Sequence, residues 1–350
     1  MANSISIEIG SHSVRAAVWN GAKTELVPLG YSSAPYFCPS VAVCLDGDRF
    51  LFGDYAKNYI YTNPENFHHI SDVDSQSQLA PVLYGALFRF IFDKAKCLTK
   101  GGLSECIIVV PSYYGKIDPR KTVLTDAARS VEMSEIRFMS DAEALCSGKV
   151  QIDNGSVILV VDWGYSGLTI SSVYREEHNL KVKYSKHNDF GGRYLDSLIL
   201  SDVENSIPST QLDGALSQLL IAGALGESAG HIKEELSHNE TCQQSVIIGN
   251  YEISRSHFVN LAAKSFADAL KLCKEVLDNS GLSFADIGQI VLCGGCSNIP
   301  YVMDLFSQYF VGNGNAKVKI CRYSDRPGYQ FDACLGAFVS NSSSLLKLSF

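Results

Sequence analysis

One hairpin design occurs twice in this chain, and no other sequence feature constrains the fold as strongly. The first copy spans residues 5–19 and the second spans residues 157–173. In each copy a strand-like run is followed by a turn of small residues and then by a second strand-like run. A carboxylate, Glu8 or Asp162, stands where the first strand ends. An internal repeat separated by about half the chain predicts two related lobes.

Strands and helices alternate along the rest of the sequence, which predicts an α/β protein. Buried-type strands are predicted at 106–110 and 290–292. Helices are predicted at 79–92, 118–132, 258–277 (closed by Gly281), 300–310 and 329–339. A tight hairpin is predicted around a turn at Gly249-Asn250.

Composition excludes several classes of protein. The 350 residues carry a net charge of −8, which argues against binding driven by attraction to nucleic acid or to acidic membranes. The most apolar helical run, residues 79–92, carries Arg89 and is too short to cross a bilayer. No export signal is visible, and eleven cysteines show no framework spacing, so we expect reduced thiols and a cytoplasmic location.

Glycine turns at strand ends allow backbone N–H groups to approach an anion closely. Three such turns occur, at Gly10, Gly164 and Gly294, and Gly191-Gly192 adds a fourth site of small residues. The carboxylates Glu8 and Asp162 are placed to hold magnesium through water, since magnesium prefers a few carboxylates together with substrate phosphates. Neither hairpin has P-loop spacing. The joint pattern predicts a site for a nucleoside di- or triphosphate.

The order of these segments resembles the nucleotide-binding domain of the heat-shock protein 70 (DnaK-like) chaperones, within the actin, hexokinase and heat-shock superfamily. The resemblance runs from about Ile5 to Ala337. It rests on residues 7–18 and 160–169 (the two phosphate loops), 37–43, 110–114 (Val-Pro-Ser-Tyr-Tyr), 189–196 (Asp-Phe-Gly-Gly-Arg-Tyr-Leu-Asp) and 291–300 (the adenosine loop).

The resemblance implies an α/β, actin-like ATPase fold in which two ribonuclease-H-like lobes surround a nucleotide cleft. The implied lobes are residues 1–152 and 153–323, with a peripheral subdomain at about 205–280. Residues 324–350 are expected to form a C-terminal helix that returns to the first lobe. The implied ligands are ATP or ADP with Mg²⁺, and the implied partner is a chaperone or co-chaperone protein in stress response and protein folding.

Site residues follow from the same alignment of motifs. Glu8, Asp141 and Asp162 are the implied catalytic carboxylates, and Glu8 and Asp162 are the implied magnesium-side groups. The implied nucleotide-binding residues are Gly10, Ser11, His12, Gly164, Tyr165, Gly191, Gly192, Lys233, Ser237, Gly294, Gly295 and Asn298.

Several positions depart from the family pattern near the phosphates. Glu8 replaces an aspartate, and Ser11 and His12 replace threonines. In the second loop the later aspartate becomes Thr169, and the bulky Tyr165 enters the turn.

Other departures remove positive charge. The family's catalytic lysine has no counterpart, because residues 63–79 contain no Lys or Arg, and His68 or His69 supplies only partial charge near neutral pH. Glu234 and Asn298 stand where the family has adenine-pocket arginines. Phosphoryl transfer depends on charge neutralisation around the γ-phosphate, so we expect weak or no hydrolysis with nucleotide binding retained.

Four functions stay open on the sequence alone. They are a nucleotide-binding chaperone partner with little hydrolysis, an active ATPase chaperone domain, a small-molecule kinase, and an interaction module that binds no nucleotide. A kinase needs a general-base aspartate for which no candidate is evident. Two minor alternatives are a redox or metal role for Cys293 and Cys296, and a metal site at His68-His69.

Overall fold

The computed structural model describes residues 3–31, 34–149, 157–176, 179–206, 229–246, 249–323 and 329–339. Two compact units divide the chain. The first takes Met1–Ile152, Arg175–Val182 and Gly328–Phe350, and the second takes Asp153–Tyr174 and Lys183–Pro327. Each unit has its own sheet and apolar core, and the predicted α/β class is confirmed. Residues 207–228 and 247–248 of the predicted subdomain at 205–280, and most of residues 324–350, lie outside the described ranges.

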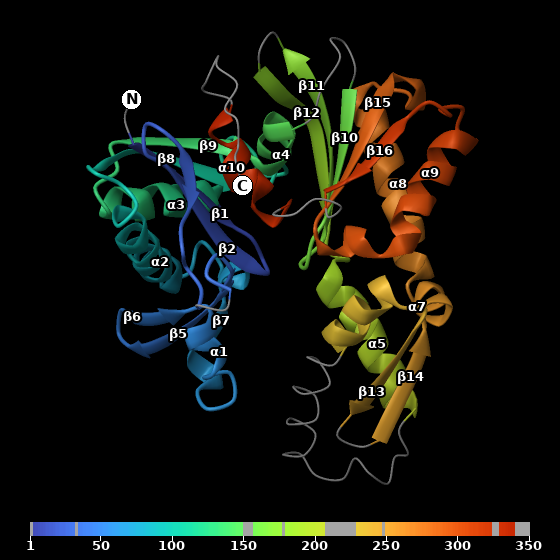
Figure 1. Ribbon diagram of the computed structural model, residues 1–350, viewed down its shortest axis with the longest axis horizontal. Helices are drawn as coiled ribbons and strands as arrows, with labels where there is room; N and C mark the ends of the chain where they lie inside the picture. The colour runs from blue at the N-terminus through green and yellow to red at the C-terminus, as the bar shows by residue number, and fades with distance from the viewer. Residues whose placement is uncertain are drawn as a thin grey trace. The chain divides into compact units, whose positions relative to one another are not determined.

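The first unit is built on a sheet whose central strand is β1 (Figure 1). Strand β1 runs antiparallel to β2 and parallel to β8, and β8 runs parallel to β9. In spatial order the strands are β3 (Thr24–Leu26), β2 (Ser13–Trp19), β1 (Asn3–Ile9), β8 (Leu103–Val110) and β9 (Glu135–Ser140), with β4 (Cys38–Pro39) also paired to β2.

Helices cover both faces of this sheet. The side chains of Ile5 and Ile7 are fully buried in one core with helices α2 (Leu79–Lys96) and α3 (Pro119–Ser130). Helices α4 (Asp141–Lys149) and α10 (Asp332–Gly336) pack against each other, and α10 also contacts β1 and β2. A Cβ on Gly336 would lie 2.0 Å from the carbonyl oxygen of Ala144, so this helix crossing needs glycine.

A smaller sheet completes the first unit. Its strand order is β6 (Arg49–Phe52), β5 (Val41–Asp46) and β7 (Phe67–His69), and helix α1 (Asp54–Lys57) lies beside it. Helix α2 contacts β6, and the rings of Phe52 and Phe90 lie 5.5 Å apart between them.

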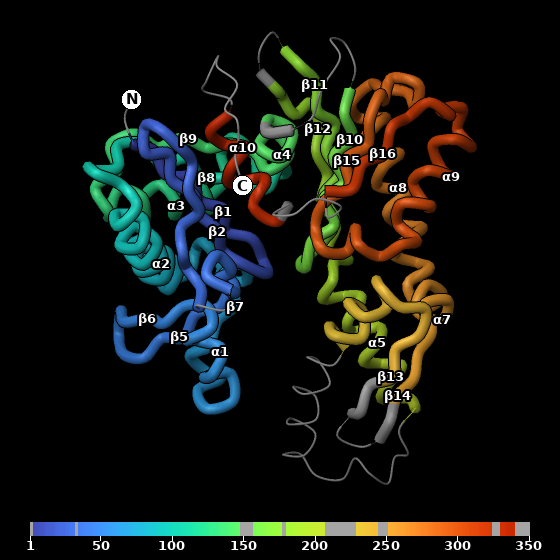
Figure 2. The backbone as a smooth tube through the Cα atoms, viewed as in Figure 1, coloured from blue at the N-terminus to red at the C-terminus, as the bar shows by residue number. Residues whose placement is uncertain are grey.

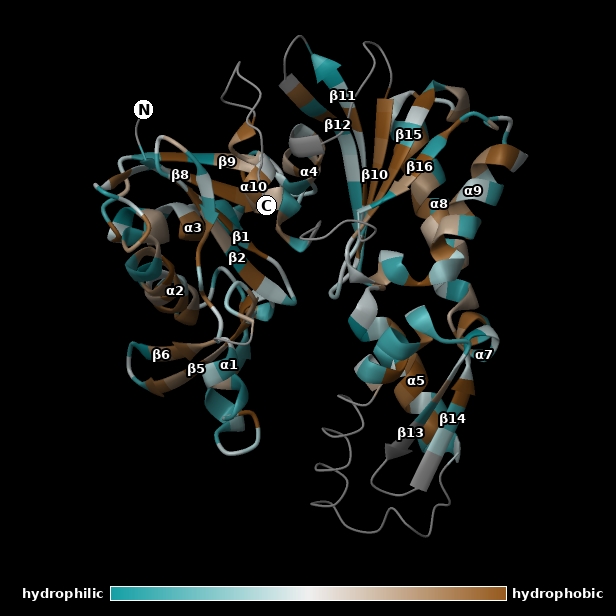
Figure 3. Ribbon diagram, in the orientation of Figure 1, coloured by the Kyte–Doolittle hydropathy of each residue, from teal (hydrophilic) through white to brown (hydrophobic). Residues whose placement is uncertain are grey.

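The second unit repeats the strand order of the first. Strand β10 runs antiparallel to β11 and parallel to β15, and β15 runs parallel to β16. In spatial order the strands are β12 (Asn179–Asn188), β11 (Leu168–Glu176), β10 (Val157–Trp163), β15 (Ile287–Cys293) and β16 (Lys319–Arg322). Strands β8, β10 and β15 are largely hydrophobic along their length, as buried parallel strands are expected to be (Figure 3).

Helices α5 (Gly192–Ser206), α7 (Arg255–Leu261), α8 (Ala263–Ser280) and α9 (Pro300–Gly312) all contribute to the core of the second unit. A two-stranded sheet joins β13 (Thr241–Val246) to β14 (Gly249–Ser254). Trp163 is fully buried in this core, and its indole nitrogen donates a 2.8 Å hydrogen bond to the carbonyl oxygen of Phe190.

Three elements differ from the sequence-based prediction; the course of the backbone through the described elements can be followed in Figure 2. Gly249 and Asn250 pair with Val246 and Ser245, so they are strand residues of β14 and do not form the predicted turn. The predicted helix at 258–277 is divided at Ala262, where no Gly or Pro marks a break, into α7 and α8. The last predicted helix is only a 3₁₀ turn (Tyr329–Phe331) followed by α10. In the described part of the chain, no helix combines the length and apolarity that a bilayer span requires.

Candidate functional site

The first hairpin ends in a tight turn stabilised by its own backbone. The N–H of Gly10 donates a 3.1 Å hydrogen bond to the carbonyl oxygen of Ser13. Ser11 is half-buried and His12 is exposed between them. The carbonyl oxygen of His12 accepts a 3.0 Å hydrogen bond from the N–H of Ser40, which holds the turn against β4. The turn predicted at Gly10–His12 is therefore present, and backbone hydrogen bonds at Gly10 and His12 hold it.

Glu8 does not stand alone in this hairpin. It lies directly opposite Arg15 across the β1–β2 ladder, and Arg15 Nη1 lies 3.0 Å from Glu8 Oε1. Both side chains are mostly buried, with 17% of Glu8 and 19% of Arg15 exposed. Glu8 Oε2, Ser13 Oγ and Arg15 Nε are buried and make no hydrogen bond to any residue in the described ranges.

Asp141 begins helix α4 and collects hydrogen bonds from its neighbours. Its Oδ1 accepts from the backbone N–H of Ser112 at 2.9 Å, from the Ser112 hydroxyl, and from the N–H of Ala142 at 2.6 Å. Burial, together with the nearby charge of Glu8, raises the pKa of Asp141 to about 6, against the hydrogen bonds that lower it. Glu8 and Asp141 therefore belong to one electrostatic cluster in the first unit.

The second hairpin has the same register as the first. Asp162 lies opposite Thr169 as Glu8 lies opposite Arg15, and the N–H of Gly164 donates to the carbonyl oxygen of Gly167 at 2.9 Å. The hydroxyl of Thr169 lies 2.9 Å from Nδ1 of His187. A Cβ on Gly167 would lie 2.4 Å from Cε1 of His187, so the imidazole packs directly on this loop.

The predicted turn at Gly191-Gly192 packs on the same loop. The N–H of Gly192 donates a hydrogen bond to the carbonyl oxygen of Gly164, and the N–H of Arg193 donates one to the carbonyl oxygen of Tyr165. Both are 2.9 Å long. The Arg193 guanidinium also lies 5.7 Å from the centre of the Tyr165 ring. The N–H of Gly192 is thus already bonded within the protein, and Gly191-Gly192 supports the second loop.

The predicted turn at Gly294 also lies at the end of β10, against Asp162 and Trp163. Gly294 has φ +79°, and a Cβ there would lie 2.4 Å from the carbonyl oxygen of Trp163 and 2.6 Å from Asp162 Oδ1. A 3₁₀ turn, Gly295–Asn298, follows, with Gly295 exposed and Asn298 half-buried. The second unit therefore gathers the predicted residues Asp162, Gly164, Tyr165, Gly191, Gly192, Gly294, Gly295 and Asn298 around the end of β10.

Lys233 and Ser237 lie on helical residues 229–238 and are engaged by their own unit. Lys233 Nζ lies 2.6 Å from Asp196 Oδ1 and donates a 3.1 Å hydrogen bond to the carbonyl oxygen of Gly192. Burial raises the pKa of Asp196, and the charge of Lys233 opposes that shift. The Ser237 hydroxyl donates to the carbonyl oxygen of Lys233 one turn earlier.

The cysteines show no redox or metal arrangement. All eleven lie in the described part of the chain, none is joined in a disulfide, and eight are buried. Burial raises the pKa of Cys296 to about 12, so its thiol is protonated and unreactive at neutral pH. Cys293 is likewise buried, at the end of β15.

His68 and His69 both lie in strand β7, and burial lowers the pKa of His68. His68 therefore supplies even less positive charge at neutral pH than an exposed imidazole. No three His, Cys, Asp or Glu side chains gather to hold a metal ion among the residues that the structure describes.

These groups fit a phosphate better than they fit a magnesium ion. In the first unit the Glu8 carboxylate already has a cation beside it, and the Asp141 carboxyl near it accepts hydrogen bonds from Ser112 and Ala142. In the second unit Thr169, opposite Asp162, supplies no second carboxylate. At an effective dielectric constant of about 20, a divalent ion about 4 Å from a guanidinium is repelled by about 8 kcal/mol, which offsets its attraction to Glu8. Arg15 Nε and Ser13 Oγ, by contrast, are buried donors of the kind that phosphate oxygens accept from.

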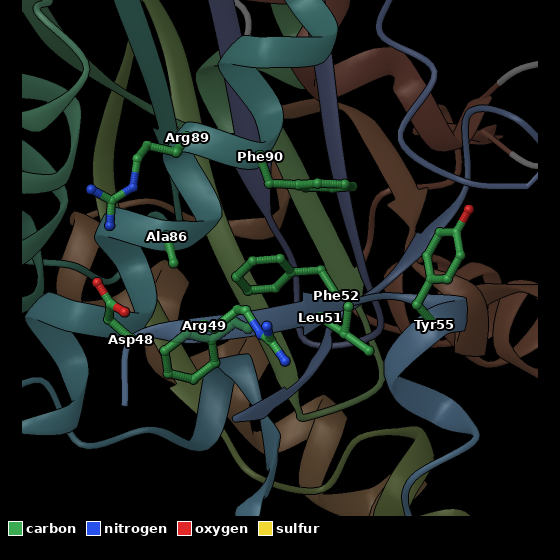
Figure 4. A pocket seen from close by; sticks show the side chains of 9 residues that line it. Asp48, Arg49, Leu51, Phe52, Tyr55, Ala86, Arg89 and Phe90 are labelled. Atoms are coloured by element: carbon green, nitrogen blue, oxygen red, sulfur yellow. The ribbon is translucent and has the colours of Figure 1, made fainter. Parts of the chain in front are cut away.

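One pocket of about 540 Å³ lies elsewhere in the first unit, between β6 and α2 (Figure 4). It contains none of the hairpin residues. Its floor is aromatic and apolar, and Asp48, Arg49 and Arg89 lie along its edge. Because the edge carries charges of both signs, the charge of the pocket does not indicate whether it would bind an anion or a cation. The lining residues are Asp48, Arg49, Phe50, Leu51, Phe52, Tyr55, Ala86, Arg89 and Phe90.

Sequence comparison identifies the family. The family described as "Hsp70 protein" matches residues 69–319, which is most of the chain. A mitochondrial-type heat shock protein 70 of Encephalitozoon cuniculi (strain GB-M1) is 27% identical over 248 residues, covering 66% of this chain and 41% of that protein. The chain thus spans about two fifths of the length of that relative. The duplicated α/β sheets are those of the actin-like ATPase fold, and the chain belongs to the Hsp70 family.

Proposed function

We propose that this chain is a nucleotide-binding domain that binds ATP or ADP. The observation that carries the proposal is the pair of matched hairpins, each closed by the same glycine N–H to carbonyl hydrogen bond, in a chain of the Hsp70 family. Tight turns of this kind present backbone N–H groups and a small surface to an anion.

In the first unit the proposed phosphate contacts are Gly10, Ser11 and His12. In the second unit, the proposed phosphate loop is Gly164-Tyr165, supported by Gly191-Gly192. The proposed nucleoside contacts are Lys233, Ser237, Gly294, Gly295 and Asn298.

We propose further that hydrolysis is slow or does not occur. Glu8, Asp141 and Asp162 are the remaining candidates for catalytic carboxylates. Glu8 is paired with Arg15, and the N–H and hydroxyl of Ser112 bind Asp141, which leaves less carboxylate charge to position an attacking water. Residues 63–79 provide no lysine or arginine to stabilise the γ-phosphate in the transition state.

A protein that binds nucleotide without rapid turnover is suited to a regulatory role. We propose that nucleotide shifts the conformational equilibrium of the domain and that a chaperone or co-chaperone partner reads that change. A cytoplasmic location and a part in protein folding under stress complete this proposal. The supporting facts are the family membership and the eleven cysteines of the described ranges, which form no disulfide, as is typical of a reducing compartment.

Isothermal titration calorimetry with ADP and with ATP tests the binding claim. We expect saturable binding with a dissociation constant below about 1 mM. The matched variants are Gly164→Trp, which fills the second loop, and Gly115→Trp, which adds the same bulk at a glycine where a new Cβ would meet no atom within 4 Å. Loss of heat in the first variant and not in the second supports the hairpin site. No saturable heat with either nucleotide, at about 1 mM or more, refutes the proposal.

A single-turnover assay separates the proposed domain from an active ATPase. With enzyme in excess over labelled ATP, we expect at most a very slow conversion to ADP. Fast conversion that Asp162→Ala abolishes establishes an active ATPase instead. Fast conversion that survives this substitution shows a contaminating enzyme.

One observation favours an interaction module that binds no nucleotide. Lys233 is held by Asp196 and by the carbonyl oxygen of Gly192, so a nucleoside has to displace these contacts to reach it. Asp196→Asn releases that lysine. If the native chain shows no nucleotide binding while Asp196→Asn binds measurably, the site is blocked by the ion pair and the interaction module is the better description.

A further inference from the structure

In each hairpin the residue that faces the carboxylate across the strand pair lacks the negative charge that a metal site would need. Strand register places Arg15 opposite Glu8 in the first hairpin and Thr169 opposite Asp162 in the second. Both partners follow their carboxylate by seven residues, so they are equivalent positions of the repeat. One position carries a cation and the other a neutral hydroxyl.

In the first hairpin the net charge of the facing pair is zero. Arg15 Nη1 contacts Glu8 Oε1 at 3.0 Å, and less than one fifth of either side chain is exposed. Because the pair lies in a buried strand ladder, the guanidinium stays beside Glu8 instead of moving into solvent. A divalent ion placed at Glu8 meets a fixed positive charge as well as the carboxylate.

In the second hairpin the facing position brings no negative charge. The Thr169 hydroxyl lies 2.9 Å from His187 Nδ1, and the same imidazole packs against Gly167 in the loop. Thr169 is buried, with 7% of the residue exposed. A magnesium ion in such a site needs several carboxylate or phosphate oxygens, and this position offers none beyond Asp162.

We propose that this chain binds its nucleotide without a divalent cation, and that Arg15 is the residue that determines this. The inference rests on the proposed nucleotide binding. Arg15 supplies within the protein the positive charge that a metal ion brings elsewhere. Its buried Nε, which makes no hydrogen bond within the described ranges, is a donor for a phosphate oxygen. The ligand is then the metal-free nucleoside di- or triphosphate.

Calorimetric titration with ADP, once in excess EDTA and once in excess magnesium chloride, tests the proposal on the native chain. We expect the dissociation constant in EDTA to equal or fall below that in magnesium, within about twofold. Binding that is about tenfold or more tighter with magnesium overturns the inference but leaves nucleotide binding standing. Absence of binding in both buffers instead refutes the proposed function, so the two failures are distinguishable.

Two arginine variants test whether Arg15 is the residue that allows ADP to bind without magnesium. Arg15→Met should weaken ADP binding in EDTA about tenfold or more, and magnesium should restore part of it. The matched control is Arg137→Met, which removes an arginine from an ion pair with Glu105 on the same sheet. It should change the ADP dissociation constant by no more than about twofold, both in EDTA and in magnesium. If Arg15→Met fails to fold, Arg15→Lys keeps the charge and should keep binding in EDTA. Equal effects of Arg15→Met and Arg137→Met overturn the role of Arg15.

Discussion

Removing Arg15 should destabilise the first unit strongly, because it leaves the Glu8 carboxylate buried without its cation. Arg15→Met keeps much of the side-chain length and apolar surface while deleting the charge. Glu8 then lacks the 3.0 Å contact to Arg15 Nη1 and remains close to the Asp141 carboxyl. An uncompensated buried charge is far more costly than the pair is stabilising.

The structure sets the magnitude. Breaking a buried ion pair by deleting one partner costs about 3–5 kcal/mol, and the 19% and 17% exposure of these side chains places this pair at about 3 kcal/mol. For a unit of this size, such a loss lowers the melting temperature by about 6–12 °C. Glu8→Gln combined with Arg15→Met removes both charges, so we expect the double variant to recover about 2 kcal/mol of the loss.

The two tryptophans allow each unit to be followed separately. Trp19 lies in β2 of the first unit and Trp163 in β10 of the second. In a Trp163→Phe background, fluorescence of Trp19 during urea unfolding reports the first unit alone. A loss below about 1 kcal/mol for Arg15→Met, or a double variant no more stable than the single one, refutes the view that Arg15 compensates a buried charge.

Three further predictions follow from the described contacts. Burial raises the pKa of Asp141 to about 6, above an unfolded value of about 3.9, so the folded chain binds more protons between these values. Stability should fall by up to about 3 kcal/mol as the pH rises from about 4 to about 6, and urea unfolding of Asp141→Asn should lack that slope. Gly336→Ala puts a methyl group 2.0 Å from a backbone oxygen of α4 and should cost about 2 kcal/mol or more, whereas Gly312→Ala, with no atom within 4 Å, should stay within about 0.5 kcal/mol; equal thermal midpoints contradict this. Trp163→Phe leaves the buried carbonyl of Phe190 without its donor and should cost the second unit about 1–3 kcal/mol, measured by circular dichroism on chemical unfolding; an unchanged midpoint contradicts it.

The duplicated hairpins were predictable because their signal is local. Alternation in residues 5–9, the apolar run at 157–161 and the glycines between strands depend on neighbouring residues only. The same holds for the start of α3, where the Asp118 side chain accepts a hydrogen bond from the N–H of Arg120, as the Asp-Pro sequence indicates.

The partners of the predicted site residues were not predictable in the same way. His187 reaches Thr169 from another strand, and Asp196 reaches Lys233 from another helix, so neither contact follows from local sequence. Ser112 binds Asp141 across 29 residues for the same reason. Arg15 is the exception, because an ideal hairpin register places it opposite Glu8, and counting seven residues from the carboxylate would have found it.

The division of helix 258–277 at Ala262 shows another limit. The apolar face continues through the break, and Ala262 itself is fully buried. Periodicity reports which side of a helix faces the core, and it is insensitive to a single residue whose backbone leaves the helical conformation.

The buried cysteines allow the opening of each unit to be measured by the rate at which their thiols are alkylated. Cys38 and Cys106 lie in the first unit and Cys273 and Cys296 in the second, and burial raises the pKa of each thiol to about 12. Such thiols react with alkylating reagents only when the surrounding structure opens. Timed labelling followed by peptide mass spectrometry therefore reads the opening rate of each sheet in one sample, and comparison with and without ADP shows which sheet the nucleotide holds closed.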